Sequence, residues 1–210
     1  MFLILLIPQV VIHHICMLRQ GVAIAIFLIA WFTRRKSVRV LLMATTPLIH
    51  SSYFIVLPLL VMSTMARRIQ LGVDLRTLLF VVVGLVIGGS LGWTASLLGA
   101  RQAHLYSFSM GDVSGLGLIF WGMVFTVMWL EGPIFVRRFA FEMGTIIFYL
   151  VTYFTTDVAA RIFESTMLLV LLAGGHLTGW RQHFFYVILV SFGIIQYALN
   201  LRTPWLGWGI

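Results

Sequence analysis

A polar stretch inside an otherwise apolar run sets the strongest constraint on how this chain can fold. The apolar run extends from Val40 to Met65, and at its centre lies the sequence Thr45-Thr46-Pro47-Leu48-Ile49-His50-Ser51-Ser52-Tyr53. Pro47 disfavours one continuous helix through this stretch, because proline lacks the amide hydrogen that a helix interior uses. The run therefore predicts two helical arms joined by a polar turn around His50.

The rest of the chain consists of apolar segments separated by short polar connections, which indicates an all-α integral membrane protein. Hydrophobic residues make up 61% of the 210 residues and charged residues 10%, which is more apolar surface than a soluble core of this size can bury. We expect a polytopic chain with about five or six membrane-inserted helical segments plus two short re-entrant-like helical hairpins, in a single transmembrane domain over residues 1–210. The expected apolar segments are Met17–Phe32, Val40–Met65, Thr77–Ala100, Leu116–Leu130, Met143–Phe154, Thr166–Gly179 and Phe184–Leu201.

The segment Thr77–Ala100 carries glycines at a helical spacing. Gly84, Gly88 and Gly92 lie four residues apart and so share one helix face. Small residues on one face let another helix approach closely, and the spacing therefore predicts a tight helix–helix contact here.

The distribution of cations decides whether the Val40–Met65 run crosses the membrane once or turns back at His50. A single crossing would leave six cations outside and seven inside, which is no bias. A turn at His50 would instead leave three outside, with Arg19 near the outer boundary, and ten inside: Arg34, Arg35, Lys36, Arg39, Arg67, Arg68, Arg76, Arg137, Arg138 and Arg181. Because cations concentrate in cytoplasmic loops, we predict a re-entrant hairpin whose tip lines a cavity open to the outside.

A second segment, Met143–Gly179, has the same pattern. Its apolar arms, of about 12 and 14 residues, are too short to span a bilayer as helices, and they meet at the polar turn Thr155–Ser165. We expect both hairpin tips and the polar loop Arg101–Gly115 to meet on the outer side.

The outer face would then collect most residues that could carry chemistry. Ionisable residues at membrane depth are costly and are functional candidates for that reason. Arginines suggest an anionic ligand such as phosphate, and a histidine or a carboxylate could act as a general base. The candidates are Arg19, His50, Ser51, Ser52, Arg101, His104, Tyr106, Asp112, Asp157, Arg161 and Glu164.

Each of these candidates also has a structural interpretation. His50 can be a buried, hydrogen-bonded residue at a kink, and Arg161 and Glu164 can form a helical ion pair because they lie three residues apart. Arg101 can extend from a helix end toward the interface, and Asp112 can be a turn or N-cap residue. No metal-ligand, nucleotide-loop or serine-nucleophile motif occurs, so we expect no metal, no cofactor and no nucleic-acid partner.

Two stretches resemble the EpsG/Wzy-type polysaccharide polymerases. They are Arg19-Gln20-Gly21-Val22-Ala23, which precedes a basic loop, and Pro47-Leu48-Ile49-His50-Ser51-Ser52-Tyr53-Phe54. Arg161 matches the arginine of a further segment of that family, whereas Tyr53 replaces its usual small residue. Family members are generally longer at the N-terminus, so we expect a short or N-terminally truncated member.

The resemblance implies a metal-independent glycosyltransferase in the bacterial inner (cytoplasmic) membrane. Such polymerases join undecaprenyl-diphosphate-linked oligosaccharide repeat units into a surface polysaccharide on the outer face. The implied partners are this lipid-linked oligosaccharide, membrane lipids, a flippase and a chain-length regulator. Arg161, Arg101 and Arg19 would bind the diphosphate, and His50 would be the base, with Asp112 as second candidate. The supporting residues would be Ser51, Ser52, His104 and Glu164.

Two other functions remain open from the sequence. Broken helices with charged tips also occur in transporters, so the chain could be a transporter or channel-like subunit for an anionic solute. It could also be a non-catalytic membrane partner of a larger polysaccharide polymerase.

Overall fold

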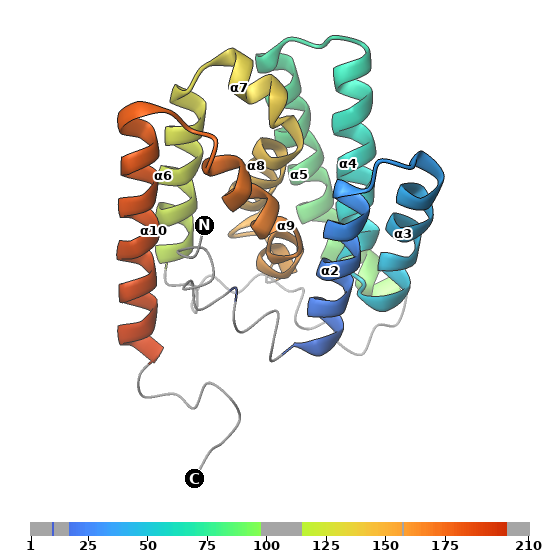
Figure 1. Cartoon of the computed structure of the whole chain (residues 1–210). Helices are drawn as coiled ribbons and strands as arrows, with labels where there is room; N and C mark the ends of the chain where they lie inside the picture. The colour runs from blue at the N-terminus through green and yellow to red at the C-terminus, as the bar shows by residue number, and fades with distance from the viewer. Residues whose placement is uncertain (1–9, 11–16, 98–114, 157, 201–210) are drawn as a thin grey trace.

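The computed structural model describes residues 10, 17–97, 115–156 and 158–200, and this part of the chain is all-helical. Its helices run back and forth between two ends of a bundle (Figure 1). They are α2 (Leu18–Phe32), α3 (Lys36–Ile49), α4 (Tyr53–Arg68), α5 (Val73–Leu97), α6 (Leu116–Leu130), α7 (Pro133–Arg138), α8 (Ala140–Thr152), α9 (Val158–Gly174) and α10 (Gly179–Asn200).

Helix α8 lies at the centre of the bundle. It contacts α4, α5, α6, α7 and α9, and eleven of its thirteen residues are buried. Most of its residues are apolar, and the polar residues Glu142, Thr145 and Thr152 are buried as well. Two apolar clusters meet on it: one contains Ile146 and Tyr149 with residues of α6, α9 and α10, and the other contains Phe141 and Phe148 with residues of α2, α4 and α5.

The predicted break in the Val40–Met65 run is confirmed, and it lies at residues 50–52 between α3 and α4. The two arms have 14 and 16 residues, which corresponds to lengths of about 21 and 24 Å. Both are shorter than a hydrocarbon core of about 30 Å. The chain reverses at this turn, and it lies toward the same end of the bundle as the start of α2 (Figure 1).

Pro47 is not the break itself, contrary to the simplest expectation, because it lies inside α3. A proline leaves the carbonyl four residues earlier without its usual amide donor, and here that carbonyl belongs to Met43. The Thr46 hydroxyl donates to the Met43 carbonyl oxygen at 2.7 Å and replaces the missing bond. The helix therefore continues past Pro47 and ends only at His50, whose backbone is extended with φ −142° and ψ 124°.

The turn of the second hairpin is shorter than predicted. Helix α8 ends at Thr152 and α9 starts at Val158, so the polar turn does not extend to Ser165. Arg161, Glu164 and Ser165 belong to the first two turns of α9 instead. The sequence-based turn was too long because these polar residues interrupt the hydropathy but not the helix.

The glycine face on α5 is confirmed for the two glycines whose surroundings are described. A methyl group added at Gly84 would meet Val151, and one added at Gly88 would meet Thr152 and Thr155. Both sites are contacts of α5 with α8 or with the turn that follows it. Gly144 of α8 packs equally closely on the Phe80 ring. These glycines allow α5 and α8 to come together.

A clasp closes the end of the bundle opposite the His50 turn. Glu131, at the end of α6, accepts a hydrogen bond from Arg181 Nε at 2.7 Å and one from the Thr178 hydroxyl at 2.7 Å. Burial raises the pKa of the Glu131 carboxyl, but the hydrogen bonds from Thr178 and Arg181 outweigh this effect and leave the pKa below its ordinary value. The clasp joins the end of α6 to Thr178 in the loop before α10 and to Arg181 in the first turn of α10.

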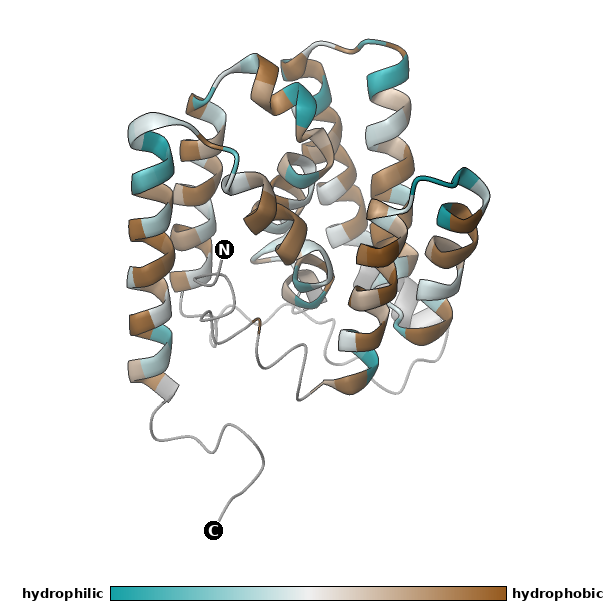
Figure 2. Ribbon diagram, viewed as in Figure 1, coloured by the Kyte–Doolittle hydropathy of each residue, from teal (hydrophilic) through white to brown (hydrophobic). Residues whose placement is uncertain are grey.

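Two of the described helices are long and apolar enough to cross a membrane, over Val73–Ser90 in α5 and Gly179–Leu199 in α10. Helices α2, α6 and α8 are apolar but shorter. Figure 2 shows apolar colours along the helices and hydrophilic colours near the helix ends and loops. Large apolar side chains such as Val86 and Ile194 are more than 60% exposed on this surface.

Candidate functional site

The His50 turn is fixed locally by backbone hydrogen bonds on both sides. The His50 amide donates to the Thr46 carbonyl at 3.0 Å and closes α3, and the Ser52 carbonyl accepts from the amides of Ile55 and Val56 as α4 begins. The turn is therefore three residues long, from His50 to Ser52. Ser51 is exposed at its tip, whereas Ser52 is buried.

A chain of hydrogen bonds connects this turn to α9. His50 Nδ1 lies 2.7 Å from Ser52 Oγ, and Ser52 Oγ lies 2.7 Å from Ser165 Oγ. The Ser165 hydroxyl in turn lies 3.1 Å from the backbone carbonyl oxygen of Arg161, one turn earlier on α9. The half-buried imidazole is thus held through two hydroxyl groups against a carbonyl of a core helix.

The direction of these bonds determines which nitrogen of His50 carries the proton. A carbonyl can only accept, so the Ser165 hydroxyl donates to Arg161. Ser165 then accepts from the Ser52 hydroxyl, and Ser52 accepts from Nδ1–H of His50, since each hydroxyl has one proton. This is the arrangement that supplies all three contacts with a proton. In a neutral ring it leaves the lone pair on Nε2.

Tyr53 fixes the same turn to the core. Its side chain is fully buried, and its hydroxyl donates to the Ser165 backbone carbonyl at 3.2 Å. Its ring lies 5.2 Å, between centroids, from the ring of Phe27 on α2. The residue that departs from the family pattern in sequence is therefore an anchor that joins α2, α4 and α9.

The structure brings some of the predicted residues together and separates others. Arg161 is exposed in the first turn of α9, and Glu164 is half-buried one turn further on. Arg19 is exposed in the first turn of α2, at the same end of the bundle as the His50 turn (Figure 1). Gln20, the next residue, is 1% exposed, and its amide nitrogen has no hydrogen-bond partner among the described residues.

Five of the candidate residues, Arg101, His104, Tyr106, Asp112 and Asp157, lie outside the described residues. The predicted roles of Arg101, His104 and Asp112 in binding, support and proton transfer therefore stay predictions. Within the described part, no group of three or more His, Cys, Asp or Glu side chains is close enough to hold a metal ion.

Sequence reasoning did not include Ser165 or Tyr53 among the functional candidates. The signal for Ser165 was its position four residues after Arg161, which places both on one helix face. Its partner Ser52 is 113 residues away in the chain, so no local pattern could pair them. Tyr53 was visible in sequence only as a bulky residue at a position where a small one was expected.

Comparison of the chain with protein families, curated proteins and solved structures finds no match. The resemblance to the polysaccharide polymerases therefore rests on the stretches Arg19–Ala23 and Pro47–Phe54 and on Arg161.

Proposed function

We propose that this chain is a membrane polymerase that joins lipid-diphosphate-linked oligosaccharide repeat units on the outer face of a bacterial inner membrane. The observation that carries the proposal is the hydrogen-bonded His50, whose tautomer and orientation are set by Ser52 and Ser165. A base held in one orientation is what transfer to a sugar hydroxyl requires.

The reaction needs one proton acceptor and a group that stabilises the departing diphosphate. His50 Nε2 takes the proton of the acceptor hydroxyl as its oxygen bonds to the anomeric carbon of the donor. The bond from that carbon to the diphosphate oxygen breaks, and the lipid diphosphate leaves with the electron pair. Arg161, on the helix that anchors His50, and Arg19, at the same end of the bundle, supply positive charge to this leaving group.

Membrane insertion with the His50 end outward is part of the proposal. Two features support it. Helices α5 and α10 are long and apolar enough to span. Of the ten cations predicted to lie inside, those of the α4–α5 connection, α7 and the start of α10 lie at the opposite end of the bundle, and the other four lie in or just after the α2–α3 connection, away from the His50 turn (Figure 1). The hairpin tip would then face the compartment in which lipid-linked repeat units are polymerised.

The test is polysaccharide length in a strain that lacks the gene and is complemented with variants. His50→Asn keeps a side-chain N–H that can donate to Ser52 but has no basic nitrogen in place of Nε2. We expect this variant to accumulate and to fold like the wild type, while polymerisation falls by about 10² to 10⁴-fold. His183→Ala is the matched control, because His183 is exposed at the start of α10 and should leave polymer length unchanged.

Three outcomes are distinguishable. Normal polymer with His50→Asn would show that His50 only holds the turn. Loss of polymer with both His50→Asn and His183→Ala would point to general damage rather than to a missing base. Unchanged polysaccharide in the uncomplemented deletion strain would overturn the polymerase proposal, and would favour the anionic-solute transporter or the non-catalytic partner.

A further inference from the structure

A second set of cationic side chains lies at the end of the bundle opposite His50. Arg67 ends α4, Arg76 lies in the first turn of α5, and Arg137 lies near the end of α7. Together with Gln70 and Leu71 they line a cavity of about 410 Å³, which is within the range of roughly 300–1,000 Å³ for small-molecule sites. We call this the arginine cavity.

Arg76 is the unusual member of the arginine cavity, because it is 5% exposed. Its Nη2 donates to the Leu71 carbonyl at 3.1 Å, but its Nε and Nη1 have no hydrogen-bond partner among the described residues. Buried guanidinium groups are normally paired, since leaving one unpaired costs its full desolvation. The free Nε–H and the free Nη1 hydrogens point to different sides of the guanidinium, so the group still has donors to offer an acceptor in the cavity.

The charges around Arg76 increase its preference for an anion. Arg67 and Arg137 are both close enough to repel its charge. Glu142 of α8 lies in the field of Arg67, and no salt bridge to Arg76 is present in the described part of the chain. Three guanidinium groups and no carboxylate are among the described residues that line the cavity, so its occupant should be an anion.

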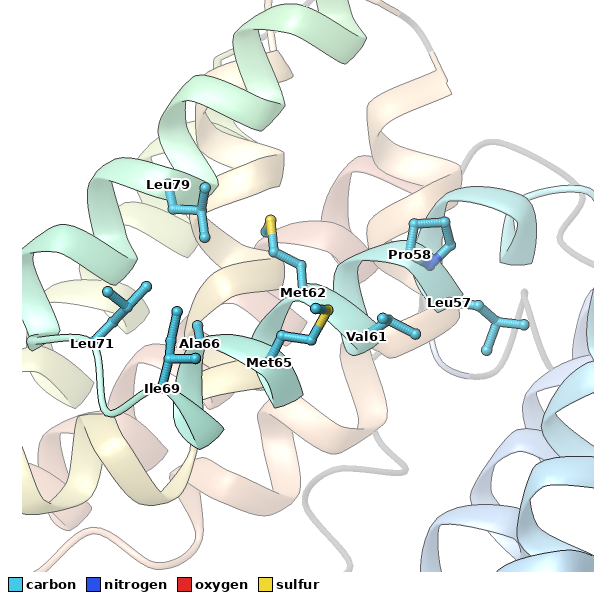
Figure 3. A pocket seen from close by; sticks show the side chains of 9 residues that line it. All are labelled: Leu57, Pro58, Val61, Met62, Met65, Ala66, Ile69, Leu71 and Leu79. Atoms are coloured by element: carbon cyan, nitrogen blue, oxygen red, sulfur yellow. The ribbon is translucent and has the colours of Figure 1, made fainter.

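An apolar groove adjoins the arginine cavity and indicates what carries that anion. The groove has a volume of about 580 Å³ and lies between α4 and α5 (Figure 3), which are consecutive but pack mainly on α8. Its lining on α4 runs from Leu57 to Ile69, a distance of about 18 Å along the helix. Leu79 and Met62 point toward each other across it (Figure 3). Leu71 lines both the groove and the arginine cavity, so the two adjoin at this residue.

We propose that this composite site binds an anionic phospholipid, with its phosphate on Arg67, Arg76 and Arg137 and an acyl chain in the α4–α5 groove. The phosphate supplies an acceptor for an unpaired nitrogen of Arg76, and the acyl chain covers the apolar lining of the groove. The inference rests on the membrane insertion that the proposed function requires, but not on polymerase activity. The lipid would come from the cytoplasmic leaflet, where the cations are predicted to lie.

The experiment measures lipid binding to the purified full-length chain in detergent, as a shift in thermal unfolding and as binding by titration. Three probes separate the parts of the ligand: dioleoyl-phosphatidylglycerol, dioleoylglycerol (the same chains without phosphate) and inorganic phosphate. We expect only phosphatidylglycerol to raise the unfolding temperature. Equal protection by inorganic phosphate would overturn the role of the groove, and equal protection by dioleoylglycerol would overturn the role of the arginines.

Variants locate the binding. Arg76→Gln should weaken phosphatidylglycerol binding on the order of tenfold or more, and Leu79→Trp, which fills the groove, should weaken it as well. If Arg76→Gln does not fold, Arg137→Gln replaces it in the binding experiment. Arg137 is exposed, so its substitution should leave the fold intact. Arg34→Gln is the matched control, an exposed cation of the α2–α3 loop that lines neither cavity. Unchanged binding by folded Arg76→Gln or Arg137→Gln would refute the site.

A failure here is separable from a failure of the proposed function. Polymer length in cells tests the His50 site, whereas binding of phosphatidylglycerol to the purified chain tests the composite site. Loss of lipid binding with normal polymer, or the reverse, would reject one proposal and leave the other standing.

Discussion

Gln70 has a backbone conformation that its side chain does not favour. Its φ is 54°, in the left-handed region, and it follows α4 where glycine is the usual residue. The Leu71 amide donates to the Ala66 carbonyl and the Gln70 amide to the Arg67 carbonyl, both within 3.2 Å, as in a Schellman motif. Strain of this kind persists where a side chain serves another purpose, and Gln70 lines the arginine cavity.

Replacing Gln70 with glycine should therefore stabilise the chain while it removes a side chain from the cavity. We expect Gln70→Gly to increase the free energy of unfolding by about 1 kcal/mol and to reduce phosphatidylglycerol binding. Thermal unfolding in detergent measures the first effect. Arg68→Gly, in the helical last turn of α4, is the control and should destabilise by a similar amount. A destabilised Gln70→Gly chain would contradict the strain argument.

At the scale of single residues, the sequence predicted features that depend on neighbouring residues in the chain. Pro47 and the polar residues beside it were enough to place His50 in a turn. The Thr46 hydroxyl that lets α3 continue past Pro47 was not predicted, because a threonine in an apolar run can bond several carbonyls. Ser165 could not be assigned either, since its role depends on contact with Ser52 from a distant part of the chain.

Among the elements, the clasp between α6 and α10 gives a pH-dependent prediction. The Glu131 pKa is lowered in the folded chain, so its contribution to stability is present above about pH 4.3, the ordinary pKa of glutamate. That contribution is lost as the pH falls through the lower, folded-state pKa. Glu131→Gln should lose about 1 kcal/mol at pH 7 and show a smaller further loss between pH 5 and pH 3 than the wild type.

Thermal unfolding of both chains across that pH range checks the clasp. The difference between them should shrink as the pH falls, because protonation removes the charge that the variant already lacks. A difference that stays constant would mean that Glu131 acts through its hydrogen bonds alone. Arg138→Gln, in α7 outside the clasp, should follow the wild-type pH dependence.

The helices themselves were largely predictable, because most of them overlap an apolar run. Helix α6 was predicted with its observed bounds. Helix α7 was missed, since six residues that include Arg137 and Arg138 have no apolar run of their own. Helix α9 begins earlier than predicted because Arg161, Glu164 and Ser165 lowered the hydropathy of its first turns without interrupting its backbone bonding.

For the whole molecule, the orientation in the membrane is the prediction to test. Ser51 is exposed at the tip of the turn and Ser37 is exposed at the start of α3, so each can carry a reporter cysteine in a chain whose Cys16 is replaced with alanine. An impermeant thiol reagent should label Ser51→Cys in intact cells and Ser37→Cys only after permeabilisation. Labelling of both positions from the same side would reject the re-entrant hairpin.

The predicted all-α class is confirmed for the described residues, whereas the arrangement of the helices could not be predicted. Hydropathy does not distinguish an apolar side chain that is buried in the protein from one that lies on its surface. Phe148 of α8 is 1% exposed and Ile194 of α10 is 64% exposed, yet both are apolar residues within apolar segments. The central position of α8 follows from contacts between distant segments and not from a property of its own sequence.

That central position has a consequence for how the chain is made. Helix α8 has 13 residues and would extend only about 20 Å, too little to be held by the bilayer as an independent span. It leaves the ribosome after α2 to α6 and before α9 and α10. In the membrane orientation proposed above, its place must therefore be supplied by the helices made before it, and the face of α8 that packs on α9 stays uncovered until α9 folds back. The order of synthesis makes the N-terminal helices the template on which the rest of the protein assembles.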